Sequence, residues 1–144
     1  MRRVTMRLAL AAACVLMLAA GFLRAEGGQN GNPGWNLPPT AAAEKNPLTV
    51  NPAVLAAGRK FFVSKCQRCH GPEGAGDGPD ADSNFAERMD LRKVSRAADN
   101  PDGVVFHKIW TGRVKPKMPP FADELSREQA WAIVAYVQTL RTMK

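Results

Sequence analysis

Two cysteines and a histidine form the most chemically distinctive cluster in this sequence, Cys66-Gln67-Arg68-Cys69-His70. At the end of a helix, two thiols three positions apart face the same side of the chain. They could form a disulfide or a thiol redox pair, contribute to a zinc site, or add to the two vinyl groups on one edge of a porphyrin. In the last case the adjacent histidine would direct a ring nitrogen toward the iron.

Spacing and context favour the porphyrin interpretation. A thioredoxin-type pair normally follows a strand and opens a helix, whereas this pair ends a predicted helix. A structural zinc site needs four ligands, and His107 is the one further His or Cys after residue 25. We therefore predict one covalent haem c, attached through Cys66 and Cys69, with His70 as an axial iron ligand. Zinc binding and thiol redox chemistry remain the alternatives.

The iron would have a sixth position, and three downstream side chains are candidates for it. Met118 lies in Lys117-Met118-Pro119-Pro120-Phe121, where the prolines hold the loop extended and favour a methionine directed at a target. Met89 lies in a charged stretch and is expected to be a half-exposed packing residue. His107 falls away from the apolar stripe of its predicted helix and is expected at the surface. Met118 is therefore the predicted ligand.

Helix signals surround the cluster. Asn51-Pro52 predicts a helix start, with an apolar stripe that includes Gly58. A glycine on that stripe suggests that another helix approaches closely. Asn100-Pro101 predicts a second helix that ends at Gly112. Ser126 and Gln129 form a capping box before a third helix that is apolar on two faces.

The connecting segments look irregular. Residues 71–80 are rich in glycine and proline, and residues 81–99 have a mixed pattern that allows one helical turn. Val114–Phe121 holds three prolines and is expected to be an extended loop. There is no strand signal and no internal repeat, so the sequence predicts an all-α domain.

The first 25 residues resemble a secretory leader. Arg2, Arg3 and Arg7 precede the apolar run Leu8–Leu23, with cleavage plausible after Ala25. The run has 16 residues, fewer than the roughly 20 that span a bilayer. We therefore predict a signal peptide over residues 1–25 and a periplasmic or exported protein. A membrane anchor facing the periplasm is the alternative.

Charge and composition limit the remaining possibilities. The 144 residues carry a net charge of +7, but removing residues 1–25 leaves 16 basic against 13 acidic residues. This weakens a nucleic-acid interpretation, and a mean hydropathy of −0.26 excludes a polytopic membrane protein. Residues 26–50 read as a Pro/Gly-rich linker or strap, in which Trp35 is expected to dock on the domain surface. The domain itself would cover residues 51–144.

From Asn51 to Leu140 the chain resembles the class I monohaem cytochrome c family, particularly small bacterial domains. The resemblance rests on the attachment motif and on Gly58…Phe62, Gly74-x-Gly76-x-Gly78-Pro79, Met118-Pro119-x-Phe121 and Trp131…Tyr136. It implies three to five short helices around the haem, with Gly58 and Phe62 meeting Ile133 and Tyr136. It also implies that the Pro79 carbonyl accepts a hydrogen bond from His70. Residues 80–96 are more charged than expected for a haem-packing segment, and Arg92 is the candidate propionate contact.

These features predict an electron carrier rather than an enzyme, because a six-coordinate iron leaves no open position for a substrate. The alternative is a haem c subunit of a larger respiratory or dehydrogenase complex. A one-haem peroxidase would require Met118 to be absent from the iron. Partner redox proteins, acidic or membrane-bound, would dock at a basic face around the haem edge. The residues of that face are Lys65, Arg68, Arg113, Lys115 and Lys117.

Overall fold

The computed structural model describes residue 32 and residues 34–141. In these residues the fold is all-α, with five short α-helices, as predicted. They are α2 (Pro52–Lys65), α3 (Gln67–His70), α4 (Ala86–Met89), α5 (Asp102–Thr111) and α6 (Arg127–Leu140). Two short 3-10 helices, η2 (Ser83–Phe85) and η3 (Val94–Arg96), flank α4. The predicted leader lies outside the described residues, and no described helix is long and apolar enough to cross a membrane.

The start of α2 follows its local sequence signals. The side-chain oxygen of Asn51 accepts hydrogen bonds from the backbone N–H groups of Ala53 and Val54, at 2.9 and 3.0 Å. Pro52 occupies the first helical position, where no N–H is needed. The helix ends at Lys65, and a single non-helical residue, Cys66, separates it from α3.

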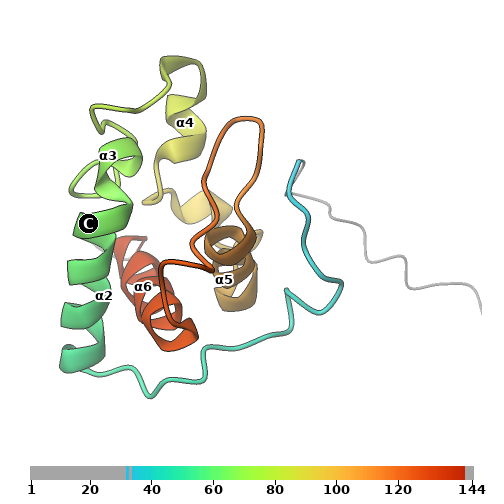
Figure 1. The fold of residues 1–144 in the computed structure, drawn as a ribbon, viewed down its shortest axis with the longest axis vertical. Helices are drawn as coiled ribbons and strands as arrows, with labels where there is room; N and C mark the ends of the chain where they lie inside the picture. Colours follow the sequence, from blue (N-terminus) through green and yellow to red (C-terminus); the bar gives the residue numbers. More distant parts are fainter. Residues whose placement is uncertain (1–31, 33, 142–144) are drawn as a thin grey trace, which may run out of the picture.

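Helices α2 and α6 lie side by side and pack against each other (Figure 1). A Cβ atom on Gly58 would collide with the backbone carbonyl of Ala132 and lie 2.9 Å from the Cβ of Tyr136. One turn further, the rings of Phe62 and Tyr136 pack with centroids 5.3 Å apart. The sequence therefore correctly placed Gly58 at a close approach between the first and last helices.

Helix α5 covers the other side of α6. Phe106 and Trp131 stack with centroids 4.2 Å apart and an interplanar angle of 13°. All residues of α6 from Ala130 to Val137 are buried, which explains its two apolar faces. The capping box predicted for Ser126 and Gln129 is present in both directions, at 2.9 and 3.2 Å.

The predicted cap of α5 is wrong by one residue. Pro101 is the N-cap, and the side chain of Asn100 does not cap the helix. Its amide instead donates to the Arg96 carbonyl at 2.8 Å, and its oxygen accepts from the Lys108 ammonium. The buried Lys108 ammonium takes this amide oxygen as one of its two side-chain acceptors, because a buried cation is costly unless it is hydrogen-bonded. The end of α5 at Gly112, with φ of 61°, is as predicted.

The loop from Gly112 to Phe121 is closed rather than simply extended. Arg113 and Met118 form an isolated antiparallel bridge, with N–O distances of 2.8 and 3.0 Å. The Phe121 N–H then donates to the Ile109 carbonyl at 3.1 Å, which ties the loop to α5. Both the N–H and the carbonyl of Met118 are therefore held by hydrogen bonds to Arg113.

The strap, defined here as residue 32 and residues 34–50, runs along α5 and the lower edge of the molecule to the start of α2 (Figure 1). Its Glu44 carbonyl accepts from the Gly103 N–H at 3.1 Å, and its Asn46 amide donates to the Trp131 carbonyl at 3.0 Å. Trp35 packs against the domain beneath Lys108 and Arg113, as expected from its isolation in the sequence.

Replacing Gly58 with alanine tests the α2–α6 contact. Helix propensity alone predicts a gain of about 1 kcal/mol in the free energy of unfolding. The clash with the Ala132 backbone predicts instead a net loss of about 1–3 kcal/mol. Guanidinium unfolding of the Gly58→Ala protein measures the sign. Ala56→Gly, at an exposed position of the same helix, calibrates propensity, and a stabilised Gly58→Ala variant would contradict the packing.

Candidate functional site

A cavity of about 510 Å³ lies between α3, α5, α6 and the Met118 loop. Its walls are mainly apolar and come from distant parts of the chain. The apolar lining residues include Phe62, Leu91, Val105, Ile109, Phe121, Ile133 and Val137. Cys66, Cys69, His70 and Met118 line the same cavity, so four of the predicted site residues are brought together.

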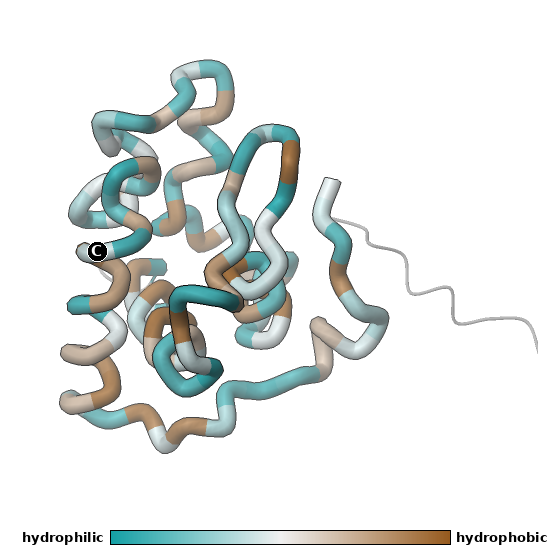
Figure 2. Tube along the Cα trace, viewed as in Figure 1, coloured by the Kyte–Doolittle hydropathy of each residue, from teal (hydrophilic) through white to brown (hydrophobic). Residues whose placement is uncertain are grey.

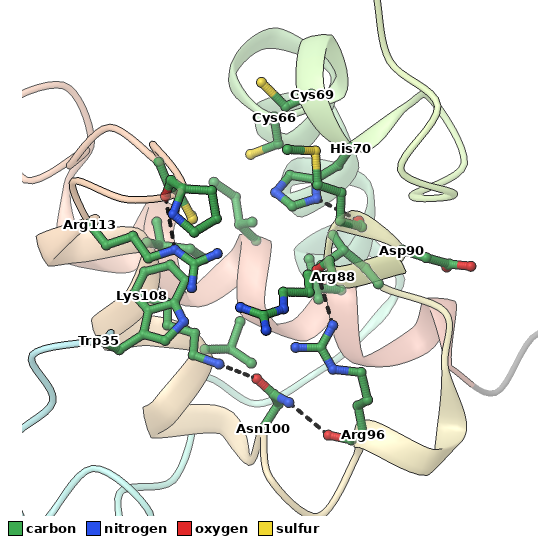
Figure 3. A pocket seen from close by; sticks show the side chains of 18 of the residues that line it. Trp35, Cys66, Cys69, His70, Arg88, Asp90, Arg96, Asn100, Lys108 and Arg113 are labelled. Atoms are coloured by element: carbon green, nitrogen blue, oxygen red, sulfur yellow. Dashed lines mark hydrogen bonds between the residues drawn. The ribbon is translucent and has the colours of Figure 1, made fainter. Parts of the chain in front are cut away.

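The attachment motif forms one end of this cavity. The break between α2 and α3 at Cys66 places both sulfurs on the cavity side of the turn (Figure 3). Both cysteines are free thiols. Burial and, to a lesser extent, the nearby Cys69 raise the pKa of the Cys66 thiol to about 12. A partly buried thiol that stays protonated is a poor redox nucleophile, which argues against the thiol redox alternative.

The imidazole of His70 has a defined orientation. Its Nδ1 lies 2.8 Å from the backbone carbonyl of Met89. A carbonyl can only accept, so Nδ1 carries the proton and Nε2 presents a free lone pair. Burial lowers the pKa of His70, against the opposing effect of this hydrogen bond. The ring is therefore neutral near pH 7 and suited to coordinate a metal through Nε2.

The acceptor implied for His70 was the Pro79 carbonyl, and the structure corrects this to Met89. The Gly78-Pro79 turn lies against the start of α3 instead. A Cβ on Gly78 would collide with the carbonyls of Gln67 and Arg68, and the Asp80 N–H donates to the Arg68 carbonyl at 2.7 Å. The chain then returns under the histidine at residues 89–91, where Leu91 N–H donates to the Gly74 carbonyl at 2.8 Å. A backbone acceptor has no residue-type signal that a sequence could reveal.

The structure sets His107 apart from the two methionines as a candidate for the sixth position. Met118 and Met89 are partly buried and both line the cavity. His107 is not among the lining residues and is mostly buried, with 17% of its side chain exposed. Its Nε2 lies 2.7 Å from Glu44 of the strap. The expected surface histidine is thus covered by the strap, whose docking site could not be read from helical periodicity.

The end of the cavity away from the cysteines is cationic, and sequence reasoning missed it. Arg88, Arg96, Lys108, Arg113 and Arg141 line this region, together with Asn32, Trp35 and Asn100 (Figure 3). Arg92, the residue expected to contact a propionate, is exposed and pairs with Asp90 at 3.1 Å. The five cationic residues come from five segments of the chain, so no local pattern in the sequence marks them.

The zinc alternative finds no support in the part of the chain that the structure describes. No group of three or more His, Cys, Asp or Glu side chains is placed there to hold a metal ion. The donor set instead matches a porphyrin site: two thiols at one edge, an oriented imidazole, a thioether and an apolar lining. The cationic end would suit the carboxylates that a haem carries.

Comparison with known proteins agrees with this geometry. A family model for cytochrome c matches residues 55–141, which is more than half of the chain. The chain therefore belongs to the cytochrome c family, which implies covalently bound haem c and a role in electron transfer.

Among solved structures, one similar chain belongs to the reducing HAO-like protein complex of Kuenenia stuttgartiensis. It shares 32% sequence identity and superposes with a TM-score of 0.55, covering 65% of this chain. The match covers 46% of that chain, so this protein spans less than half of its neighbour's length. A comparison with curated proteins finds no match.

Substitution of both cysteines tests their assignment as attachment points. Cys66→Ala and Cys69→Ala singly should each retain one thioether, whereas the double variant should lose covalent haem. Intact mass spectrometry and haem staining after denaturing electrophoresis measure this directly. Met118→Ala is the control, because it removes a cavity residue without removing a thiol. Haem that stays bound to the denatured double variant would contradict the assignment.

Proposed function

We propose that this protein is an exported c-type cytochrome that transfers single electrons through one haem held between His70 and Met118. The observation that carries the proposal is the oriented, neutral imidazole of His70, which shares a cavity with both thiols and with Met118. When bound, the haem iron supplies a one-electron redox couple.

The residues of this chain would tune that couple in two ways. The thioether of Met118 favours ferrous iron and raises the reduction potential relative to a second histidine. The apolar lining from α5 and α6 acts in the same direction, because it disfavours the additional charge of ferric iron. With both axial positions taken by protein ligands, the site would bind no substrate at the iron, which supports a carrier over an enzyme.

A haem c subunit of a larger oxidoreductase complex is the second candidate. The structural neighbour belongs to a multi-protein complex, which favours this possibility. The role would use the same haem site, with a permanent partner in place of transient ones.

We further propose that acidic redox partners dock beside the Met118 loop. Lys65 and Arg68 contribute less than expected, since they pair with Glu124 at 2.6 Å and Asp80 at 2.7 Å. Lys115 and Lys117 are exposed and form no ion pair with another described residue.

In the sequence, the apolar residue Val114 lies between the end of α5 and these two lysines. Val114 is 83% exposed, and Figure 2 shows an apolar stretch between hydrophilic ones in this outermost loop. Val114 and the two lysines give this loop both an apolar and a basic contact group for an acidic partner.

The proposed location is the periplasm. The leader-like pattern of residues 1–25 supports export. Covalent haem attachment through reduced thiols is also consistent with an exported protein.

The Met-to-iron charge-transfer band in the near infrared tests the axial ligands. The oxidised wild-type protein should show this band, and Met118→Ala should lose it. Met89→Ala is the matched control, because it removes the other cavity methionine while keeping the Met89 carbonyl that His70 uses. Retention of the band in Met118→Ala, or its loss in Met89→Ala, would overturn the assignment.

Reduction of ferricyanide, an anionic oxidant, tests the docking surface. Stopped-flow rates should fall as salt rises, and Lys115→Gln with Lys117→Gln should lower the low-salt rate several-fold. Lys45→Gln, which removes one charge from the exposed strap, is the control and should have a smaller effect. Rates that are independent of salt would contradict a basic docking face.

A further inference from the structure

Lys108 is a buried cation without a carboxylate partner. It is 8% exposed, and its ammonium donates to the side-chain oxygens of Asn32 and Asn100. Trp35 lies over it, with the ring centroid 5.2 Å from the ammonium nitrogen (Figure 3). Both hydrogen-bond acceptors are neutral amides, so no direct contact of the ammonium supplies a negative charge.

The surroundings of Lys108 make this charge more costly. Burial, together with the charges of Arg96, Arg113 and Arg141, lowers the pKa of Lys108 to about 7, while Asp99 acts in the opposite direction. Arg141 adds a second sign of a missing partner. The Nε of Arg141 is buried and has no hydrogen-bond partner among the described residues. A buried cationic cluster with an orphaned donor is the arrangement expected around an anion.

The position of this cluster matches the chemistry of a porphyrin attached at Cys66 and Cys69. The vinyl groups and the two propionates of haem lie on opposite edges of the ring. Thioether bonds to the cysteines would fix the vinyl edge at α3, which turns the propionates toward the other end of the cavity. Lys108, Asn100 and Arg96 line that other end (Figure 3).

We propose that Asn32, Trp35 and Lys108 form a haem propionate site, so that the segment before the family-matched domain completes the cofactor pocket. The proposal rests on the proposed covalent haem. Asn32 and Trp35 lie outside the residues that match the family model, 55–141. In this protein, Lys108 balances a propionate, Asn32 holds its ammonium in place, and Trp35 shields the pair from water.

The strap has the attachments that such a role requires. Glu44 contacts α5 twice. Its carbonyl accepts from the Gly103 N–H, and its carboxylate lies 2.7 Å from Nε2 of His107. Ala41 is 2% exposed and packs over Gly103, where a Cβ atom would collide with the Ala41 carbonyl. Asn32 itself donates to the Asp99 carbonyl at 2.7 Å. These contacts fix the segment over the cationic end of the cavity.

The reduction potential reports on Lys108. A positive charge beside the haem disfavours ferric iron, so its removal lowers the potential. Spectroelectrochemical titration of the holoprotein should show a lower potential for Lys108→Gln than for wild type. Lys45→Gln, an exposed lysine outside the cavity, removes the same charge and should shift the potential much less. Equal shifts in the two variants would overturn the proposal.

A double-mutant cycle tests the strap. Asn32→Ala should lower the potential in the wild-type background and change it much less in the Lys108→Gln background, because the amide acts through the lysine. Equal effects of Asn32→Ala in both backgrounds, or no effect in either, would overturn the role of the strap. The single Asn32→Ala variant also keeps the proposal testable where Lys108→Gln fails to fold.

Two further measurements distinguish a propionate site from a free-anion site and from a change of axial ligand. Adding inorganic phosphate at constant ionic strength should leave the wild-type potential unchanged, since a propionate already occupies the site. A phosphate-dependent potential would show a site for free anions and would overturn the proposal. The Lys108→Gln and Asn32→Ala variants should keep the near-infrared Met-to-iron band, because neither substitution touches an axial ligand. Absence of the band from the wild-type protein would count against Met118 ligation and not against the role of the strap.

Discussion

The hydrogen bond between Nδ1 of His70 and the carbonyl of Met89 is the interaction on which the site depends. It fixes the tautomer of the imidazole, and with it the direction of the free lone pair on Nε2. It also joins α3 to the end of α4 across the glycine-rich loop. Displacement of this carbonyl would release both the histidine and the wall of the cavity that Leu91 forms.

Around this contact the helices and loops enclose a mainly apolar cavity. The contact of α2 with α6 at Gly58 places the end of α2, and therefore the cysteines, beside the apolar face of α6. Helix α5 and its following loop bring Met118 to the same cavity. A haem in this cavity would complete the apolar core, which would help a domain of this size to be stable.

Local signals predicted much of this arrangement. The Asn51 cap, the Ser126 capping box and the Gly112 helix end depend on neighbouring residues, and all three are confirmed. Gly58 was also predictable, because a glycine on an apolar helical stripe costs helix stability and is tolerated where another backbone comes close. Family, cofactor and the all-α fold followed from the attachment motif and its context.

Interactions between distant segments could not be predicted in the same way. The acceptor for His70 is a backbone carbonyl, which any residue at position 89 would supply. The roles of Asn100 and Lys108 depend on a strap that begins far earlier in the sequence. His107 lies beneath that strap, so its predicted exposure was wrong for the same reason.

Iron K-edge X-ray absorption spectroscopy of the oxidised holoprotein tests the central claim most directly, because it counts the atoms bound to the iron. We expect a low-spin iron with one sulfur ligand and five nitrogens, four from the porphyrin and one from His70. A first shell of nitrogen or oxygen alone, or a five-coordinate iron, would contradict the account.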